Sequence, residues 1–459
     1  MNTENPILPS SFRDPAGFLF IHDGTLYRQV NLSYRDHYEM FNSSGLYSSL
    51  IKKKLLITHE EVALPAQDPK TAFRIIRPHL IPFISYPYEW CFSQLKHAAL
   101  LTLEIQKISL EHDMTLKDAS AYNVQFLEGK PVFIDTLSFA PYEPGKPWSA
   151  YRQFCRHFLA PLALMKYNDI RLGQLFHSNI DGIPLDLTSS MLKKRTWLNM
   201  GILIHIHLHA KSERKYANMH IPIKPREISK HSLLGLLDSL TTTIEKMNWQ
   251  PKGTEWAGYY QETNYSAEAF EHKKEIVARY LETLNPKTLW DLGANNGFFS
   301  RIASDSGIFT LAFDIDPACV ELNYREIVQK KEKNLLPLLL DLTNPSPGIG
   351  WQNTERDSLK DRGPADTVFA LALIHHLAIS NNVPLGQIAK YFSMLGNSFI
   401  IEFVPKTDSQ VQRLLMNRKD IFNEYTEENF DRIFLRYFFI EDKERIKGSE
   451  RSLYLLKKR

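Results

Sequence analysis

The sequence predicts a two-part α/β protein whose C-terminal half is a doubly wound, mostly parallel sheet and whose N-terminal half is α+β. Three observations support this prediction. A glycine-bearing turn at residues 293–297 joins a strand to a helix, and further apolar strands alternate with helical patterns up to residue 404. Polar side chains stand at the carboxyl ends of these strands, where open parallel sheets bind their ligands.

The first strand of the predicted sheet leads into the glycine turn. Residues 288–290 have the character of a buried strand end, and Asp291 and the turn follow them. Gly293 and Gly297 allow a tight turn in which the backbone approaches a ligand closely. A helical pattern begins at residue 298. Together these elements form a favourable site for a nucleoside cofactor, although the spacing does not match the Gly-x-Gly-x-x-Gly dinucleotide fingerprint.

The next two strands each end in an acid. Residues 309–313 form an apolar strand followed by Asp314, about 20 residues beyond the glycine turn, where a nucleotide fold places an acid against ribose hydroxyls. Asp316 before Pro317 predicts the start of a helix. After that helix, residues 335–342 form a third strand that ends around Asp341.

The pattern Asp-x-Gly-x-x-x-Gly that begins at Asp291 resembles motif I of class I S-adenosyl-L-methionine (SAM)-dependent methyltransferases, and the two acidic strand ends strengthen the resemblance. The resemblance implies a Rossmann-like domain that binds SAM, with Asp341 beside the adenine amino group. The cofactor-binding positions that it implies are Asp291, Gly293, Asn295, Gly297, Asp314 and Asp341. A Rossmann-like domain that binds no SAM is the alternative explanation.

The remaining strands complete the predicted domain. Residues 366–374 form a continuous apolar run, as expected of a parallel strand buried on both faces, and two histidines follow it. The later elements are a helix at 384–395, a fifth strand at 398–404 that contains Glu402, and a closing hairpin at 435–440 and 453–456. This hairpin matches the antiparallel edge of the seven-stranded methyltransferase sheet.

The residues after the fourth strand indicate the chemistry. SAM carries its own activated methyl group, so the protein must orient the acceptor and, where needed, remove a proton. His375 and His376 lie at the strand end that faces the sulfonium in the resembled family, where they either act as a general base or only line the pocket. The Asn/Asp-Pro-Pro-Tyr motif of amino-group methylation is absent there. This favours a hydroxyl or carbon acceptor on a small molecule or glycan over adenine in nucleic acid.

Length and composition divide the chain into parts. At 459 residues the chain exceeds a single ordinary core, so more than one domain is expected. The predicted parts are an N-terminal domain at 1–210, a connector at 211–264 and a methyltransferase domain at 265–459. Residues 267–284 predict a helix, and class I methyltransferases have a helix here that helps cover the cofactor. Tyr259, Tyr260 and Tyr265 before it either face the pocket or pack the connector onto the domain.

The N-terminal domain contains a second, fainter pattern. Asp118, Asn123 and Asp135 resemble the catalytic segment of protein and small-molecule kinases, in which the first Asp handles the acceptor hydroxyl and the other two residues hold magnesium. Lys117 departs from the kinase pattern, Asp135 does not begin an Asp-Phe-Gly motif, and Arg28 is a weak substitute for the phosphate-binding lysine. An active kinase, a degenerate kinase-like lobe and a chance resemblance stay open.

Three other features have two explanations each. His205, His207 and His209 alternate along a predicted strand, so that they share one face and either bind zinc or form a hydrogen-bonded or solvated surface. Trp351, in a loop rich in proline and glycine, either stacks on adenine or substrate or anchors its loop. The basic triplet at residues 193–195 indicates a solvated face, with a local polyanion-binding patch as the alternative.

Composition limits the partners and the location. A net charge of +3, from 55 basic and 52 acidic side chains, argues against a general nucleic-acid binder. Cys91, Cys155 and Cys319 indicate free thiols in a reducing compartment. No apolar run approaches the length of a membrane span and the N-terminus has no secretion signal, so a cytoplasmic protein without a membrane partner is expected. The oligomeric state stays open.

As a whole, the chain resembles the bacterial two-part SAM-dependent methyltransferases of the nodulation type. Three functions follow as hypotheses. The first is a methyltransferase whose N-terminal region selects the acceptor. The second is a bifunctional protein whose kinase-like lobe phosphorylates a hydroxyl. The third is a non-catalytic scaffold that binds SAM without turnover.

Overall fold

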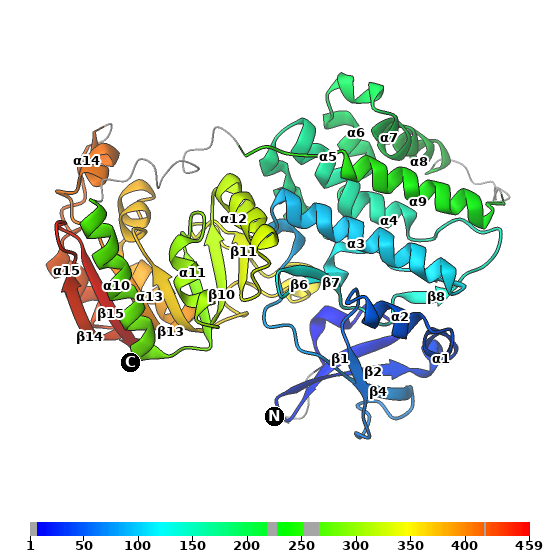
Figure 1. Cartoon of the computed structure of the whole chain (residues 1–459), viewed down its shortest axis with the longest axis horizontal. Helices are drawn as coiled ribbons and strands as arrows, with labels where there is room; N and C mark the ends of the chain where they lie inside the picture. Colours follow the sequence, from blue (N-terminus) through cyan, green and yellow to red (C-terminus); the bar gives the residue numbers. More distant parts are fainter. Residues whose placement is uncertain (1–6, 218–226, 252–265, 417–418) are drawn as a thin grey trace. The chain divides into compact units, whose positions relative to one another are not determined.

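The computed structural model describes residues 7–217, 227–251, 266–416 and 419–459. The chain forms two compact units (Figure 1): unit 1 comprises Met1–Gln250 and Gly348–Arg356, and unit 2 comprises Pro251–Pro347 and Asp357–Arg459. Helix α9 (Lys230–Glu245), which the sequence analysis assigned to a connector, belongs to unit 1 because it packs along α3 (Phe92–Glu111). Tyr259, Tyr260 and Tyr265 lie outside the described residues.

Unit 1 begins with a four-stranded antiparallel sheet in the order β1-β2-β4-β3. Its elements are β1 (Gly17–His22), β2 (Thr25–Asn31), α1 (Arg35–Ser43), α2 (Leu46–Lys52), β3 (His59–Glu61) and β4 (Ala72–Pro78). Asp23 and Gly24 connect β1 to β2 with φ values of 47° and 71°, as a two-residue hairpin turn requires. This hairpin opens the α+β half of the chain.

The rest of unit 1 is mainly helical and is built around α3. Two small antiparallel sheets, one of β5 with β8 and one of β6 with β7, lie beside this helix. The elements are β5 (Met114–Leu116), β6 (Val124–Leu127), β7 (Lys130–Phe133), β8 (Phe139–Pro141), α4 (Tyr151–Phe154), α5 (Ala160–Tyr167), α6 (Leu185–Met191), α7 (Met200–Ile202) and α8 (His209–Ala217). The α+β character predicted for the N-terminal half is confirmed.

Residues 200–217 form one continuous helix in which the π-helical segment η8 (Leu203–Leu208) joins α7 to α8. Ile202, Ile206 and Ala210 are buried at intervals of four residues. This interval is close to the helical period and differs from the two-residue period of a strand. The prediction that three histidines alternate along a strand in this segment is therefore wrong.

Unit 2 is built on a seven-stranded sheet in the order β11-β10-β9-β12-β13-β15-β14. The strands are β9 (Thr288–Leu292), β10 (Phe309–Asp314), β11 (Leu335–Leu339), β12 (Ala365–Ala370), β13 (Gly396–Phe403), β14 (Phe438–Arg445) and β15 (Ser452–Lys458). Strands β9 to β13 are parallel, and β15 runs antiparallel to both β13 and β14. The predicted doubly wound sheet with an antiparallel edge is confirmed.

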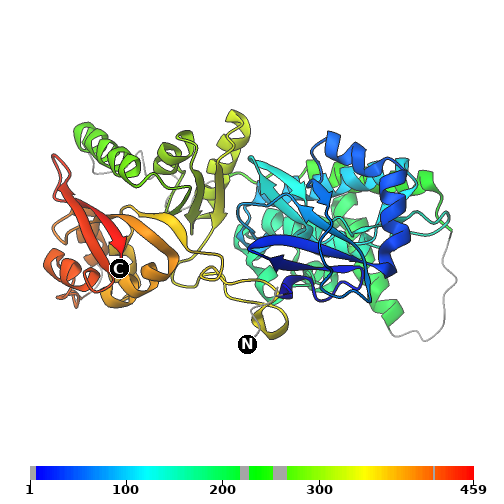
Figure 2. The same ribbon diagram turned by 90° about the horizontal axis from the view of Figure 1, so that it is seen from below.

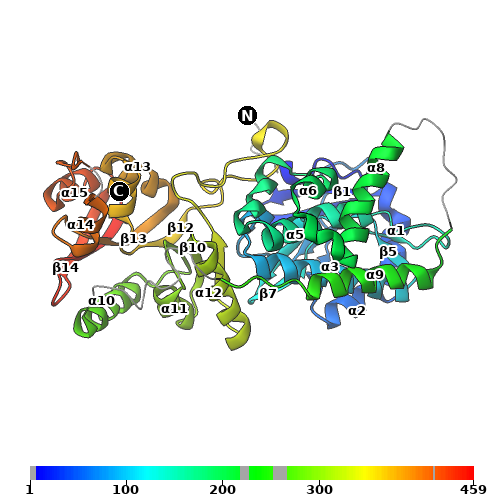
Figure 3. The same ribbon diagram turned by 90° about the horizontal axis from the view of Figure 1, so that it is seen from above.

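Helices cover both faces of this sheet (Figures 2 and 3). On one face, Ile400 of β13 packs with Ile276 and Phe299, which come from α10 and α11. The preceding residue, Phe399, points to the other face and stacks on Phe392 of α13, with 5.5 Å between the ring centroids. The helices are α10 (Ala267–Leu284), α11 (Phe298–Asp305), α12 (Pro317–Lys330), α13 (Leu385–Leu395), α14 (Ser409–Leu415) and α15 (Glu427–Phe434).

The predictions for the start of α12 and for the cysteines are also confirmed. Asp316 Oδ1 accepts a hydrogen bond of 2.8 Å from the Ala318 amide and caps α12, as the Asp-Pro sequence predicts. The three cysteines, Cys91, Cys155 and Cys319, are free and buried. Within the described ranges, no helix combines the length and the apolar character needed to cross a bilayer.

Candidate active site

The glycine turn at the carboxyl end of β9 has a left-handed backbone at three positions. Gly293, Asn295 and Gly297 have φ values of 78°, 53° and 80°. The amide of Gly293 donates to the Phe313 carbonyl at 2.9 Å and so fixes the turn beside β10. A Cβ atom at Gly293 would lie 3.2 Å from Leu373 Cδ1, and one at Gly297 would lie 2.4 Å from the Asn323 amide. Backbone conformation and space both favour glycine at these two positions.

Two of the predicted acids face this turn. Asp314 accepts hydrogen bonds from the Asn295 amide at 2.7 Å and from the Asp316 amide at 2.8 Å. Burial raises the pKa of Asp314 to about 6 against these hydrogen bonds. Asp291 accepts from Ser300 Oγ at 2.6 Å, and burial raises its pKa to about 7. Both carboxylates therefore lie at the first two strand ends, where the sequence analysis placed them.

The third acid, Asp341, follows β11 and turns back on its own loop. Its Oδ1 accepts hydrogen bonds from the Thr343 amide at 2.8 Å and from Thr343 Oγ1 at 2.6 Å. The remaining carboxylate oxygen makes no hydrogen bond with the described residues. Its predicted place beside an adenine amino group stays a prediction.

The histidine pair follows an irregular segment. Strand β12 ends at Ala370 and not at residue 374 as predicted, and Ala372 takes a left-handed φ of 49°. A left-handed conformation is uncommon outside glycine, and such backbone is frequent at functional sites. The segment after it places His375 and His376 side by side, with 4.1 Å between the ring centroids.

Both imidazoles are neutral near pH 7. Burial lowers the pKa of His375 well below its usual range, and the charges of His376 and Arg451 act in the same direction. The pKa of His376 falls to about 4, mainly because of burial. His375 is 2% exposed, and its Nδ1 has no hydrogen-bond partner among the described residues. The unused nitrogen of the neutral His375 imidazole can accept a proton, but the lowered pKa makes it a weaker base than an exposed histidine.

A buried charge network lies at the same edge of the sheet. Glu402, at the end of β13, accepts from Lys273 Nζ at 2.6 Å and from Arg451 Nη1 at 3.2 Å. Arg451 Nε also donates to Asp408 at 2.7 Å. All four side chains are almost fully buried, so their opposite charges compensate one another where water cannot. The sequence analysis identified only Glu402 among them.

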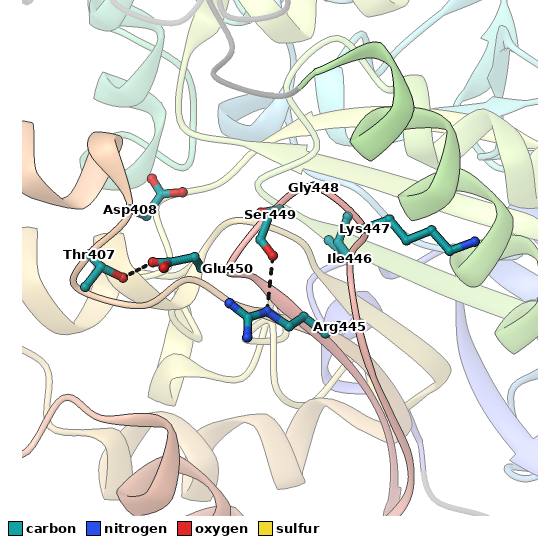
Figure 4. Close-up of a pocket in the computed structure, with 8 residues that line it drawn as sticks. All are labelled: Thr407, Asp408, Arg445, Ile446, Lys447, Gly448, Ser449 and Glu450. Carbon is teal, nitrogen blue, oxygen red and sulfur yellow. Dashed lines mark hydrogen bonds between the residues drawn. The ribbon is translucent and has the colours of Figure 1, made fainter.

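The same edge contains a cavity of about 620 Å³ (Figure 4). It is lined by Thr407, Asp408, Arg445, Ile446, Lys447, Gly448, Ser449 and Glu450. The pairing of Ser452 with Phe403 places the β14–β15 turn beyond the carboxyl end of β13. Thr407 Oγ1 donates to the Glu450 carboxylate, and Arg445 Nε donates to the Ser449 carbonyl at 3.2 Å. The walls of the cavity therefore offer both hydrogen-bond donors and acceptors.

In unit 1, the residues of the kinase-like pattern do lie close together. Asp135 accepts from Arg28 Nη1, from Ser138 Oγ at 2.5 Å and from the Leu137 amide at 3.1 Å. Asn123 Nδ2 donates to the same Ser138 hydroxyl at 3.2 Å. Burial pushes the pKa of Asp135 upward, but Arg28 and these hydrogen bonds outweigh burial and hold it below its usual value.

The first acid of the pattern is part of the same cluster. Burial raises the pKa of Asp118, and the charge of Asp135 raises it further. Arg28 also pairs with Asp14 at 3.0 Å, so this guanidinium compensates two carboxylates. In the described part of the chain, no group of three His, Cys, Asp or Glu side chains is arranged to hold a metal ion. Asp118, Asn123 and Asp135 converge, but a cationic side chain occupies the position next to Asp135.

Zinc binding by the three histidines of residues 205–209 is not supported. His205 bonds to Tyr151 OH at 2.8 Å and to Ser239 Oγ at 2.9 Å. His207 bonds to Ser189 Oγ at 2.8 Å and to Thr196 Oγ1 at 2.9 Å, while His209 lies 3.5 Å from Glu213. His205 and His207 therefore belong to separate hydrogen-bonded contacts within a helical bundle, and the hydrogen-bonded alternative holds for these two.

The loop that contains Trp351 belongs to unit 1. Its Ile349 packs against a cluster of buried aromatic rings, and the guanidinium of Arg356 lies 4.3 Å from the ring centroid of Tyr122. Glu355 pairs with Arg13 at 2.5 Å. Trp351 itself is 64% exposed. Of the two roles considered for Trp351, anchoring of the loop is wrong, because the residues on either side of it provide the anchors. Stacking on adenine or substrate stays a prediction.

Comparisons with known proteins give the following similarities. No family model matches the chain. The chain is 35% identical over 452 residues to the nodulation protein NoeA of Rhizobium meliloti, and the match covers 97% of this chain and 94% of that protein.

Solved structures are similar over part of the chain. WbdD is 12% identical and matches 40% of this chain and 39% of its own, with a TM-score of 0.28. The PH0226 protein of Pyrococcus horikoshii is 18% identical and matches 45% of this chain and 100% of its own, with a TM-score of 0.30. The magnesium protoporphyrin IX methyltransferase ChlM of Synechocystis, solved with bound SAH, is 15% identical and matches 44% of this chain and 91% of its own, with a TM-score of 0.30.

Proposed function

Because the chain belongs to the family of the nodulation protein NoeA and unit 2 has the seven-stranded sheet of class I methyltransferases, we propose that the protein transfers a methyl group from SAM to an acceptor at the carboxyl edge of that sheet. One observation carries the proposal. The carboxylate of Asp314 accepts from the Asn295 amide in the left-handed glycine turn, and Leu373, two residues before His375, borders Gly293 of the same turn.

The residues at the turn fit the parts of SAM. Asp314 keeps acceptor capacity beyond its two backbone hydrogen bonds, since each carboxylate oxygen can accept more than one, and ribose hydroxyls can donate to it. Gly293 leaves the backbone accessible for the methionine part, because a side chain would fill the space toward Leu373. When bound, SAM supplies an activated methyl group. The cofactor positions Asn295, Gly297, Asp291 and Asp341 complete the proposed site.

The acceptor is proposed to be a hydroxyl or carbon of a small molecule or glycan. His375 supports this, since a neutral imidazole with a free nitrogen can take a proton from an acceptor hydroxyl. The cavity beside β13 offers hydroxyl, carboxylate and guanidinium groups, which suit an acceptor rich in hydroxyls. We assign His375 as the base and His376 as its neighbour in the pocket.

The test uses methyl-labelled SAM with the purified protein and fractionated bacterial extract. We expect label in the small-molecule or glycan fraction with the parent protein, and a loss of at least about 100-fold with His375→Gln, the usual scale of general-base catalysis. The His375→Gln variant should still bind SAM in calorimetry. His231→Gln, an exposed histidine of α9, is the matched control and should transfer like the parent.

Other results would overturn the proposal. Label in nucleic acid would contradict the acceptor class. Equal transfer by His375→Gln would remove the assigned base. SAM binding without label in any fraction would favour the third hypothesis, a scaffold that binds the cofactor without turnover.

A phosphoryl-transfer or nucleotide-binding role of unit 1 is a second candidate. The convergence of Asp118, Asn123 and Asp135 favours it, because these are the positions that the kinase-like pattern names. The test is thermal stabilisation by ATP with magnesium. We expect stabilisation in the parent and its loss in Asp135→Ala, with Asp14→Ala as the control because it removes the other carboxylate partner of Arg28. Loss in neither variant would contradict this role.

A further inference from the structure

Unit 1 exposes several large apolar side chains within a short stretch of chain. The set is Leu187, Trp197, Leu198, Met200, Ile204 and Leu208, and we call it the 187–208 surface. Leu198 is 88% exposed and Met200 is 65% exposed. Isolated apolar side chains are common on protein surfaces, but a contiguous group of them marks a site of interaction.

These side chains form one surface. Met200, Ile204 and Leu208 recur every four residues along the continuous helix of α7, η8 and α8, so they share one face of it. The Trp197 ring stacks on His207 of the same helix, with 4.4 Å between the centroids and 10° between the planes. Helix α6, which carries Leu187, packs against both η8 and α8. Figure 1 shows α6, α7 and α8 close together.

Basic side chains flank this surface. Lys193, Lys194 and Arg195 are exposed in the segment between α6 and α7, and they make no ion pair with the described residues. Lys211 follows Leu208 by three residues, and its Nζ lies 5.8 Å from the centroid of the Trp197 ring. The sequence analysis interpreted residues 193–195 as a solvated face. Because they lie beside exposed apolar side chains, their charges can act together with the 187–208 surface in binding a partner.

The acids nearby are already compensated. Glu213 pairs with Arg152 at 2.7 Å and with Arg156 at 3.1 Å. Asp186 lies 3.7 Å from Arg214. The unpaired charges at the edge of the 187–208 surface are therefore positive, so a partner that complements this surface carries negative charge beside an apolar region.

We propose that the 187–208 surface docks unit 1 onto an anionic lipid bilayer. Leu198 and Met200 enter the boundary between headgroups and acyl chains, and Trp197 lies at headgroup depth, where tryptophan is favoured. Lys193, Lys194, Arg195 and Lys211 contact the anionic headgroups. Nucleic acid offers a similar charge but no apolar layer for Leu198. The sequence analysis expected no membrane partner because no apolar run is long enough to span a bilayer. Peripheral docking needs no spanning helix, so the proposal departs from that expectation.

The test is co-sedimentation of the full-length protein with vesicles of phosphatidylcholine containing 30% phosphatidylglycerol, and with vesicles of phosphatidylcholine alone. We expect binding to the anionic vesicles that weakens as salt is raised, because salt screens the basic side chains. Replacing Lys193, Lys194 and Arg195 by Gln should weaken binding by about 100-fold, since each cation near such a surface contributes roughly a factor of five. Replacing Leu198 and Met200 by Ser should weaken it by at least about tenfold.

Matched controls separate this surface from general electrostatic attraction. Lys52, Lys53 and Lys54 form another exposed basic triplet in unit 1, and the described large apolar side chains beside it are not exposed. Their replacement by Gln should change binding less than threefold. Brominated lipid should quench tryptophan fluorescence in the parent and less in Trp197→Phe, while Trp351→Phe, an exposed tryptophan elsewhere in unit 1, should behave like the parent.

Several outcomes would overturn the proposal. Equal losses for the two basic triplets would show non-specific attraction. Unchanged binding after replacement of Leu198 and Met200 would exclude an apolar contribution. Failure to bind anionic vesicles, together with self-association that Leu198→Ser and Met200→Ser abolish in ultracentrifugation, would show that a second copy of the chain covers this surface. All variants are at exposed positions, so circular dichroism should confirm that they fold.

Discussion

Replacing Asp314 by Ala is the sharpest test of the proposed cofactor site. The change removes a buried carboxylate that we assign to the ribose hydroxyls of SAM. A charge-assisted hydrogen bond contributes about 1.5–3 kcal/mol, so SAM affinity should fall by roughly 10- to 150-fold at neutral pH. The same carboxylate holds the Asn295 amide in the glycine turn, and this second effect acts in the same direction.

The pH dependence follows from the raised pKa of Asp314. Because this pKa is about 6 without ligand, the carboxylate is ionised at pH 7.5 and largely protonated at pH 5. A protonated carboxyl accepts ribose hydroxyls less well, so parent affinity should decrease below pH 6 by up to about tenfold per pH unit. The Asp314→Ala variant should lose this part of the pH dependence.

Isothermal titration calorimetry at pH 7.5 and pH 5 measures both effects. Asp366→Ala is the matched control, since Asp366 accepts from the Lys287 and Thr288 amides at 3.0 and 2.9 Å and lies at the start of β12, the opposite end of the strands. We expect the control to bind SAM within about twofold of the parent. Loss of the hydrogen bonds to the Lys287 and Thr288 amides lowers the stability of the fold, but it removes no group that we assign to the ribose of SAM. A folded Asp314→Ala protein with parent affinity would refute the assignment.

Three further predictions concern stability and domain structure. Burial lowers the pKa of His157 to about 3 and that of His205 to about 4, so below pH 6.5 the unfolded chain binds more protons than the folded chain. The free energy of unfolding of unit 1 should therefore fall by up to about 1.4 kcal/mol for each histidine and each pH unit below 6.5. A urea-unfolding free energy that stays constant between pH 6.5 and 4.5 would contradict this. Lys273→Met leaves Glu402 with one partner fewer and should destabilise unit 2 by roughly 3 kcal/mol, whereas Lys274→Met at an exposed pair should cost less than about 0.5 kcal/mol. A fragment that begins at Pro251 should bind SAM like the full chain, because every proposed SAM contact lies in it; a soluble fragment without affinity would show that unit 1 contributes to the site.

The strand–turn–helix unit and the acidic strand ends could be predicted because they are local patterns. Gly293, Asp291 and Asp314 are marked by glycine spacing and by acids that directly follow apolar runs. The charge network around Glu402 could not be predicted this way. Lys273 and Arg451 reach Glu402 across sequence separations of 129 and 49 residues, and nothing in the local sequence distinguishes them from surface cations.

Two errors of the sequence analysis have physical causes. The apolar run before His375 continues to residue 374, but strand β12 ends at Ala370. The prediction placed the strand end too late because an apolar sequence does not distinguish a strand from a buried turn. At residues 204–209, histidine and apolar residues alternate and imitate a strand. The buried residues Ile202, Ile206 and Ala210 are spaced by four and extend beyond residues 204–209 at both ends. The helical period therefore cannot be recognised from residues 204–209 alone.

The short stretch Gly348–Arg356 has a consequence for how the protein is made. This stretch packs on unit 1, where Ile349 is partly buried against aromatic side chains, yet the ribosome synthesises it only after the first three strands of the unit 2 sheet. Domains generally fold as units in the order of their synthesis. Here unit 1 cannot complete its folding when Met1–Gln250 has emerged, because Gly348–Arg356 is still to be made. The buried aromatic cluster that contains Tyr122 gains its contacts with Ile349 and Arg356 only after these two residues are made. The nascent chain therefore holds two incomplete units at once, and their completion is interleaved.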